Sequence, residues 1–182
     1  RKIQVRLVKG AYWDTEIKRA QEAGLPAYPL FTRKVSTDVS YLACARYLLD
    51  RRDVFYPQFA THNAHTLAAI TIMAGNGEGF EFQRLHGIGE GLYEGLMASR
   101  DLAVRIYAPV GGYRDLLAYL VRRLLEHGAN TSFVHQIADK TVRDEDLLAD
   151  PVERARRTGF SAHRSIVNPA DLFGAQRRNS AG

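Results

Sequence analysis

The stretch Arg6-Leu7-Val8-Lys9-Gly10-Ala11-Tyr12-Trp13-Asp14 decides the fold. From Ile3 to Val8, polar and apolar side chains alternate, which is the pattern of a β-strand. Gly10 ends this strand, and a helix is predicted from Asp14 to Ala23. In α/β proteins such a strand-to-helix turn lies at the carboxyl end of the sheet, where ligands bind. The turn carries two cations and two aromatic residues, so it is either a binding turn or an ordinary surface loop.

Three more strand-like segments follow, each with a helical pattern after it. The predicted strands cover residues 56–61, 80–85 and 104–110, and the helices after them cover 64–74, 90–99 and 115–126. A further helix is predicted from Thr37 to Leu49, with Ser36 or Thr37 as its N-cap, and Asn63 can cap the helix after the second strand. Alternating strands and helices are typical of a parallel sheet with helices outside. A TIM barrel needs eight such units, so four predict an α/β fold that is the second half of a (βα)8 TIM-type barrel.

The character of the sequence changes near residue 140. We predict that residues 1–140 form the half-barrel and that residues 141–182 are an extended linker or tail toward a following domain. One short helix is predicted within this tail, from Pro151 to Arg157. The chain begins with Arg1 rather than Met, and Ile3 already belongs to a strand. We therefore expect a fragment, whose missing N-terminal barrel half precedes it or comes from another chain.

Composition limits the classes of function. With 182 residues, 46% of them hydrophobic, the chain can bury the core of one domain. The net charge of +5 is mild, and the arginine pairs lack an accompanying aromatic stripe, which makes nucleic acid an unfavoured partner. An anionic small molecule or an anionic membrane surface suits this charge better. The single cysteine, Cys44, excludes a disulfide framework and indicates a reducing compartment.

The sequence pattern disfavours both a membrane-spanning segment and a metal site. No apolar run approaches the roughly 20 residues of a membrane span. No metal-ligand spacing occurs, because His62 and His65 have no third ligand nearby in the sequence. We therefore predict no metal site.

The helix predicted over residues 115–126 carries the clearest cluster of polar side chains. At 100° per residue, Tyr119, Arg122, Arg123 and Glu126 fall within an arc of roughly 100°. Two guanidinium groups with a carboxylate one turn away can hold the carboxylate of a ligand in a fork. An arginine and a glutamate four residues apart are equally common on a solvated helix face. The pattern alone leaves both explanations open.

Other turn residues also allow two interpretations. Thr32-Arg33-Lys34 offers a hydroxyl and two cations, which suit a pyrophosphate. His62 ends a strand, where its ring can donate to a cofactor carbonyl or be satisfied locally at the start of a helix. Tyr107 lies inside the fourth predicted strand and belongs either to the core or to the wall of a ligand pocket.

Six motifs, in order along the chain, resemble the proline dehydrogenase family as it occurs within bacterial bifunctional proline utilization enzymes. They are Arg6–Trp13, Tyr28–Lys34, Phe59–Asn63, Glu81–Gly87, Arg105–Gly111 and Asp115–Glu126. The resemblance extends from about Val5 to His135, and the end of the chain looks like the connector to a downstream aldehyde dehydrogenase domain. Gly112-Tyr113 departs from the family pattern. The family's active-site lysine and aspartate belong to its first four strands and have no counterpart in this sequence.

The resemblance implies FAD as cofactor and the oxidation of L-proline to pyrroline-5-carboxylate, with electrons passed to a membrane quinone. It also implies a cytoplasmic protein that associates peripherally with the inner membrane when active. Arg6 is the implied catalytic residue, beside the flavin nitrogen that accepts the hydride. The implied cofactor-binding residues are Val8, Lys9, Gly10, Ala11, Trp13, Thr32, Arg33, Lys34, Thr61 and His62. The implied substrate-binding residues are Tyr12, Leu85, Tyr107, Tyr119, Arg122, Arg123 and Glu126, with the two arginines on the proline carboxylate.

Two alternatives stand beside this interpretation. The first is a non-catalytic half-barrel module that serves assembly or anchoring, which flavin content distinguishes from an enzyme. The second, a TIM enzyme for an unrelated phosphate ligand, is disfavoured by Tyr119 and the Arg122-Arg123 pair. We expect the isolated fragment to be inactive. In it, the strand residues Ile3, Val5, Phe59, Phe82 and Ile106 are expected to lack neighbours.

Overall fold

The computed structural model describes residues 1–10, 12–75, 78–128, 136 and 139–174, with the side chains of residues 125–128 outside that part. The described residues form two compact units. The first unit contains Arg1–Lys9 and Ser40–Ala149, and the second contains Gly10–Val39 and Asp150–Gly182.

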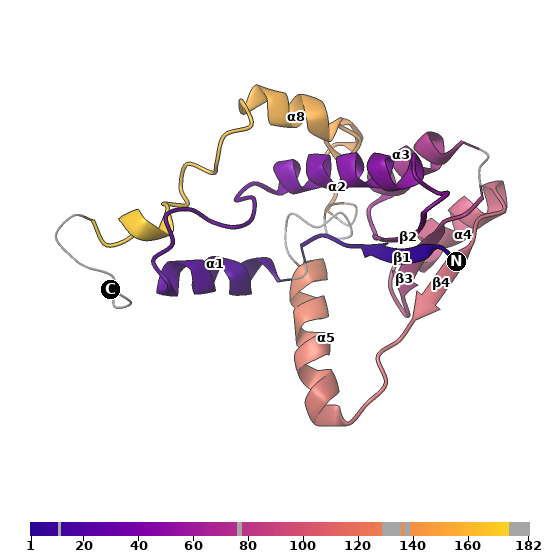
Figure 1. Ribbon diagram of the computed structural model, residues 1–182, viewed down its shortest axis with the longest axis horizontal. Helices are drawn as coiled ribbons and strands as arrows, with labels where there is room; N and C mark the ends of the chain where they lie inside the picture. The colour runs from indigo at the N-terminus through magenta and orange to yellow at the C-terminus, as the bar shows by residue number, and fades with distance from the viewer. Residues whose placement is uncertain (11, 76–77, 129–135, 137–138, 175–182) are drawn as a thin grey trace. The chain divides into compact units, whose positions relative to one another are not determined.

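The first unit contains a parallel four-stranded sheet in the order β1-β2-β3-β4 (Figure 1). The strands are β1 Ile3–Leu7, β2 Phe55–Ala60, β3 Glu81–Leu85 and β4 Val104–Tyr107. All three neighbouring pairs are parallel, which confirms the predicted α/β fold with a parallel sheet. The fourth strand was predicted to reach Val110 but ends at Tyr107. Pro109 follows closely and has no N–H with which to extend the ladder.

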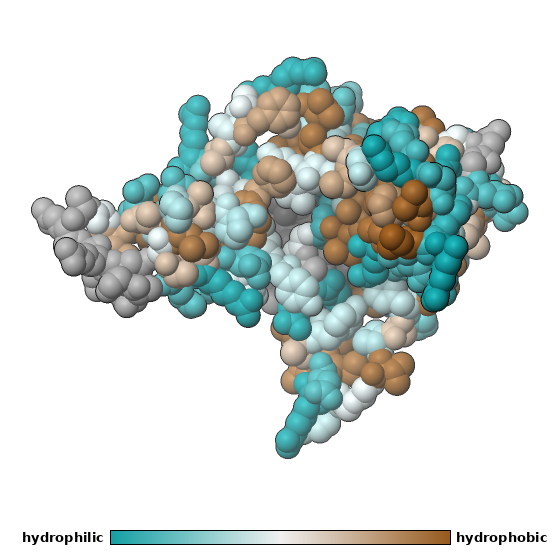
Figure 2. Space-filling view, in the orientation of Figure 1, coloured by the Kyte–Doolittle hydropathy of each residue, from teal (hydrophilic) through white to brown (hydrophobic). Residues whose placement is uncertain are grey.

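The two outer strands of this described sheet, β1 and β4, carry exposed apolar residues. Ile3 on β1 is 59% exposed and Ile106 on β4 is 52% exposed. Figure 2 shows a hydrophobic region, coloured brown, in the part of the view where β1 lies in Figure 1. These two strands are therefore the places where the sheet can accept further apolar neighbours.

Helices follow every strand, as the alternating pattern predicts. They are α1 Trp13–Glu22, α2 Lys34–Leu49, α3 Ala64–Ala74, α4 Glu90–Ser99, α5 Tyr113–Gly128, α7 Asp144–Leu147 and α8 Pro151–Arg157, with a 3-10 turn η1 at Pro169–Asp171. The N-cap predicted at Ser36 or Thr37 is wrong, because α2 begins at Lys34. The amides of Ser36 and Thr37 both donate to the carbonyl of Arg33, at 3.1 and 3.4 Å, so both residues lie within the first turn.

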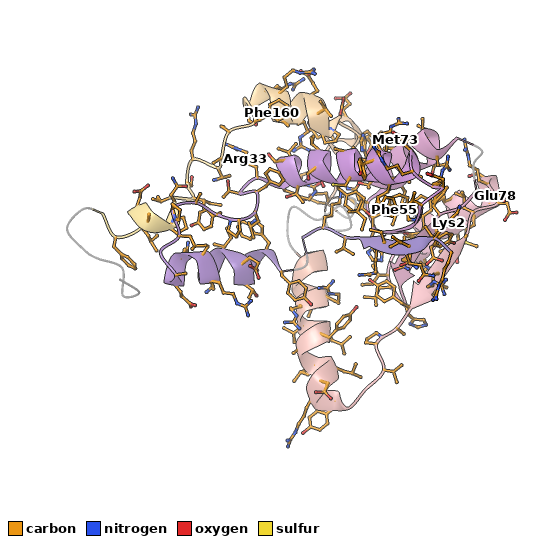
Figure 3. All side chains as sticks on the ribbon, in the orientation of Figure 1. Lys2, Arg33, Phe55, Met73, Glu78 and Phe160 are labelled. Carbon is orange, nitrogen blue, oxygen red and sulfur yellow. The ribbon has the colours of Figure 1, made fainter. Side chains whose placement is uncertain are left out.

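Three phenylalanines form the centre of the core. The Phe59 and Phe80 ring centroids are 5.8 Å apart and those of Phe80 and Phe82 are 5.6 Å apart, both edge to face. Helices α2, α3 and α4 cover them with the buried residues Tyr41, Ala45, Leu48, Leu49, Leu67, Ile70, Ala74 and Tyr93. Phe55 and Met73, labelled in Figure 3, are partly buried against this cluster. Phe59 and Phe82 are fully buried and Val5 packs on the core, so the expectation that these three would lack neighbours is wrong.

Asn63 caps α3, as predicted. Its Oδ1 accepts from the amide of Thr66 at 2.8 Å and from the Thr66 hydroxyl at 3.0 Å. Asn63→Ala is expected to lower the free energy of unfolding by about 1 kcal/mol, because it leaves an amide of the first helical turn without its acceptor. The measurement is denaturant unfolding of the protein that carries this segment. Asn168→Ala is the matched control, since Asn168 precedes η1 without a side-chain cap bond. Equal effects of the two substitutions would contradict the capping role.

The second unit contains the helix predicted from Pro151 to Arg157, which the structure confirms as α8. Beyond α8 the chain pairs with the segment before α2. Arg33, labelled in Figure 3, donates through Nε to the carbonyls of Ser161 at 2.9 Å and Ala162 at 3.2 Å. The amide of His163 donates to Thr32 Oγ1 at 2.8 Å. This part of the predicted tail is thus bound to its own unit rather than extended, and the domain boundary near residue 140 stays a prediction.

Candidate functional site

One face of the sheet is polar. Side chains two residues apart on a strand share a face, so Glu81 and Gln83 lie together on β3, opposite the buried Phe82. Register places Gln58 of β2 beside both Arg6 and Glu81, and it places Arg105 of β4 beside Gln83. The face opposite the phenylalanine core therefore carries a continuous set of charged and amide side chains.

Glu81 is the centre of this polar face and is only 3% exposed. Arg105 donates to both of its oxygens, from Nε at 2.7 Å and from Nη2 at 2.8 Å. Gln83 and Gln58 donate to Oε1 at 2.7 and 3.1 Å, and the Tyr56 hydroxyl donates to Oε2 at 3.4 Å. A buried carboxylate is tolerated when it is paired and its lone pairs are satisfied in this way. The Arg105 guanidinium, followed by Gln83, holds the pKa of Glu81 below its ordinary value, although burial opposes the shift.

Arg6 lies where this polar face meets the carboxyl end of the sheet. Its Nε donates to Gln83 Oε1 at 2.7 Å, and its guanidinium carbon lies 5.0 Å from the centroid of the Tyr107 ring. Tyr107 in turn is a neighbour of Tyr119 on α5 and helps to raise the pKa of the Tyr119 phenol. The guanidinium carbon of Arg123 lies 5.3 Å from the centroid of the Tyr119 ring. Two arginines and two tyrosines from β1, β4 and α5 thus form one group.

Burial is the main cause that raises the pKa of Tyr119, and its neighbour Tyr107 adds to the effect while Arg123 opposes it. Both tyrosines are half-buried. At neutral pH the Tyr119 phenol is therefore neutral and able to donate a hydrogen bond.

Lys9 lies just beyond β1 and contacts Thr66 and Tyr41. Its ammonium donates to Thr66 Oγ1 at 3.0 Å and lies 4.9 Å from the centroid of the Tyr41 ring. Tyr41 is 3% exposed, and its hydroxyl donates to the carbonyls of Leu7 at 3.1 Å and Ala60 at 3.4 Å. Burial raises the pKa of Tyr41. A neutral tyrosine from α2 thus joins the carboxyl ends of β1 and β2 and supports the lysine.

Tyr93 joins the carboxyl ends of β2 and β3 in the same way as Tyr41 joins those of β1 and β2. Its hydroxyl donates to the carbonyls of Thr61 at 2.7 Å and Gln83 at 3.3 Å. Beside it, His62 Nε2 accepts from the amide of Leu85 at 3.1 Å, so the neutral imidazole carries its hydrogen on Nδ1. Gly89 has a φ of +68°, and a Cβ there would lie 3.2 Å from the His62 ring. A glycine is therefore needed for His62 and α4 to approach each other.

The structure brings most of the predicted first-unit residues to one end of the sheet. Arg6, Tyr107, Tyr119 and Arg123 contact one another as described. Thr61 is 5% and Leu85 is 4% exposed, and both lie at strand ends. Val8 is exposed immediately after β1, and Arg122 precedes Arg123 on α5. Glu126 belongs to α5, but its side chain lies outside the described residues.

The remaining predicted residues belong to the second unit. Trp13 Nε1 donates to the carbonyl of Phe31 at 3.0 Å, and Lys34 pairs with Asp38 at 2.7 Å. Thr32 and Arg33 bind the backbone of residues 161–163. Gly10 has a φ of +85°, and Tyr12 is 56% exposed. Ala11 lies outside the described residues. The predicted roles of this group in phosphate and flavin binding stay predictions.

Sequence reasoning missed the residues that hold the site together, namely Tyr41, Thr66, Glu81, Gln83, Tyr93 and Arg105. The sequence does contain a signal for Glu81, Gln83 and Arg105. Polar residues recur every second position at Glu81 and Gln83 and again at Arg105 and Tyr107, which predicts a polar sheet face. For Tyr41 and Tyr93 the helical spacing predicts burial only, and it contains no information on the strand carbonyls that they reach.

Neither a cluster of metal ligands nor a membrane-spanning helix is present among the described residues. They contain no group of three or more His, Cys, Asp or Glu side chains that could hold a metal ion. No helix among them is long and apolar enough to cross a membrane.

Comparison with known proteins points to one family. The proline dehydrogenase family model matches residues 1–136. The bifunctional protein PutA of Klebsiella aerogenes is 58% identical over the whole of this chain, and the chain spans 15% of that protein. The proline dehydrogenase of Deinococcus radiodurans is 33% identical over 72% of this chain, which spans 39% of that protein.

Solved structures agree with these sequence relatives. A mutant of Bradyrhizobium japonicum proline utilization A matches the whole chain with a TM-score of 0.93 and 61% identity, and the chain covers 19% of that structure. Proline utilization A from Bdellovibrio bacteriovorus, inactivated by N-propargylglycine, matches 92% of the chain with a TM-score of 0.78 and 37% identity.

Proposed function

The chain belongs to the proline dehydrogenase family, and from this premise we propose that it forms the second half of a (βα)8 barrel that oxidises L-proline to pyrroline-5-carboxylate with FAD. The observation that carries the proposal is the group of Arg6, Tyr107, Tyr119 and Arg123 at the carboxyl end of the sheet. In barrel enzymes this end holds the active site. The exposed apolar residues of β1 and β4 support the barrel, because closing it would give both strands new neighbours.

The described donors suit an anionic, aromatic cofactor. Arg6 and Lys9 bring two cations to the end of β1, and the hydrogen-bond partner of Arg6 is the neutral amide of Gln83. His62 presents an imidazole with its hydrogen on Nδ1 at the end of β2. When bound, FAD supplies the acceptor for the hydride that leaves the proline ring carbon next to nitrogen. The residues that would hold it are Val8, Lys9, Gly10, Ala11, Trp13, Thr32, Arg33, Lys34, Thr61 and His62.

Each residue of the site has a defined task in this proposal. Arg6 stabilises negative charge that develops on the cofactor, and its support by neutral groups keeps that positive charge available. Arg122 and Arg123 bind the proline carboxylate as a fork, with Glu126 restraining them. Tyr12, Leu85, Tyr107 and Tyr119 line the pocket and keep water from the reacting carbon.

The other partners follow from the size of the relatives. The chain spans 15% of the matched PutA protein, which leaves room for the other barrel half and for a downstream aldehyde dehydrogenase domain. We propose that electrons pass to a membrane quinone, and that the protein is cytoplasmic and binds the inner membrane peripherally. The net charge of +5 is compatible with an anionic membrane surface.

The direct test is to purify the full-length protein that carries this segment and to record its visible spectrum and its proline-dependent reduction of a quinone analogue. Bound flavin together with proline turnover is the expected result. A folded, colourless protein without turnover would instead support the non-catalytic module.

Removing either arginine of the fork is expected to raise the KM for proline. Arg122→Ala and Arg123→Ala should each raise it about 10- to 100-fold, since one charged hydrogen bond contributes about 1.5–3 kcal/mol. Steady-state kinetics of the variants at equal flavin content measure this KM. Arg114→Ala on the same helix is the control, because Arg114 is exposed and contacts Tyr113. An unchanged KM in both fork variants would mean that this helix face is simply solvated.

A further inference from the structure

We propose that Gln83 is a positioning residue for Arg6, and that the ion pair between Glu81 and Arg105 determines which end of the Gln83 amide faces Arg6. The proposal rests on the proposed function, in which Arg6 acts on the cofactor. It adds a second group of residues, outside the predicted site, on which the reaction depends.

The contacts form a continuous line across three strands. Arg6 on β1 donates through Nε to Gln83 Oε1 at 2.7 Å. Gln83 on β3 donates through Nε2 to Glu81 Oε1, also at 2.7 Å. Glu81 accepts from both Nε and Nη2 of Arg105 on β4, at 2.7 and 2.8 Å. Gln83 is 5% exposed and Glu81 is 3% exposed, so neither side chain can readily exchange these partners for water.

The chemistry of the groups fixes the orientation of the amide. A carboxylate only accepts hydrogen bonds and a guanidinium only donates them. Between Glu81 and Arg6, the Gln83 amide can therefore lie only with its NH2 toward the carboxylate and its oxygen toward the guanidinium. The opposite orientation would leave both contacts without a matching partner, inside a buried network where that is costly. The charge of Glu81 therefore fixes the orientation of the Gln83 amide, and that orientation fixes the position of the Arg6 guanidinium.

Glu81 is held in the charged state that this arrangement needs. Arg105 lies against both of its oxygens, and Gln58 and Tyr56 donate to it as well. Hydrogen bonding to the charged form favours that form, and accordingly the pKa of the Glu81 carboxyl is lowered. The carboxylate therefore persists at neutral pH, and the amide orientation persists with it.

Strand β2 lies between β1, which carries Arg6, and β3, which carries Gln83. A small side chain on β2 leaves room for the hydrogen bond between these two residues. Register places Ala60 of β2 directly beside Gln83. Neighbouring residues in register share a face of the sheet, so the methyl group of Ala60 lies between β1 and β3 on the polar face. A larger side chain there would occupy the space that the Arg6–Gln83 hydrogen bond crosses.

The consequence for catalysis is preorganisation. A guanidinium whose Nε is bound to Gln83, and which lies near the Tyr107 ring, needs little reorganisation when charge develops beside it. Without Gln83, the Arg6 guanidinium would keep its charge, but the orientation of its plane would no longer be fixed. Flavin reduction should then become less favourable even though every residue predicted to touch the cofactor is present.

The test compares two glutamines in the full-length holoenzyme. Gln83 and Gln58 both donate to Glu81 Oε1, at 2.7 and 3.1 Å, but Gln83 also accepts from Arg6. Gln83→Met is expected to lower kcat about tenfold, the size of one charged hydrogen bond. It should also lower the two-electron flavin midpoint potential by about 30 mV, the equivalent of that tenfold change. Gln58→Met should lower both quantities clearly less than Gln83→Met, because it removes one donor to Glu81 but no hydrogen-bond partner of Arg6.

Two further variants separate positioning from general damage to the fold. Ala60→Val retains every polar group but fills the space of the Arg6–Gln83 contact, so it should lower the potential in the same direction. In an Arg6→Met background, Gln83→Met should cause no additional fall in potential, because Gln83 acts through Arg6. A wild-type potential in both Gln83→Met and Ala60→Val, or an equal fall in Gln58→Met, would overturn the proposal. A wild-type protein without flavin or proline turnover would instead refute the proposed function.

Discussion

Arg6→Met is expected to lower kcat for proline oxidation by about 10²- to 10³-fold, the loss typical of removing one preorganised donor from developing negative charge. Methionine keeps an apolar stem of comparable length, so the substitution removes the guanidinium with little change in packing. The flavin content should stay near the wild-type value, because the proposed cofactor site draws most of its contacts from other residues. Turnover in the full-length protein, normalised to flavin absorbance, measures the effect.

Arg46→Met is the matched control for this substitution. Arg46 lies on the exposed side of α2, where its contact is a 4.0 Å pair with the exposed Asp50. Surface substitutions of this kind change stability by less than about 0.5 kcal/mol, so turnover should be unaffected. Normal turnover of Arg6→Met would refute the catalytic role of Arg6, and a large loss in Arg46→Met would show that the assay reports damage to the fold.

The second large effect concerns residues 1–182 expressed alone. This 20.4 kDa polypeptide is expected to show no proline oxidation, to bind FAD weakly if at all, and to associate with other copies. Ile3 and Ile106 are exposed on the outer strands of the described sheet. The apolar side of α5 is exposed as well, with Leu117, Leu120, Val121 and Leu124 between 45% and 73% exposed. Unpaired strand edges and exposed apolar patches both promote association.

Light scattering, the flavin spectrum and the proline assay together test this expectation. Co-expression with the preceding barrel half of a PutA relative should restore both colour and turnover. Replacing Leu117 and Leu124 by glutamine should reduce association of the isolated segment without restoring activity. A monodisperse 20.4 kDa monomer with tightly bound flavin and proline turnover would contradict the prediction.

The sequence by itself determined the order and type of the elements. The residue pattern placed all four strands within a few residues, with clear alternation in the first and third, and it placed α3, α4 and α8 at the bounds that the structure has. Asn63 could be recognised as a cap because capping depends on residues three positions apart. These features are local, since burial repeats with a fixed period along a strand or helix. The six motifs likewise identified the family because each is a short contiguous run of residues.

Only the tertiary structure decided which distant side chains meet. Arg6 and Gln83 are 77 residues apart and Arg33 and Ser161 are 128 apart, and no periodicity along the chain relates such positions. Tyr41 shows the same limit, since its spacing predicted burial but not its hydroxyl contact with the carbonyls of Leu7 and Ala60. Strand register and the packing of helices on the sheet fix these distances. The line from Arg105 through Glu81 and Gln83 to Arg6 therefore exists only once the four strands lie side by side.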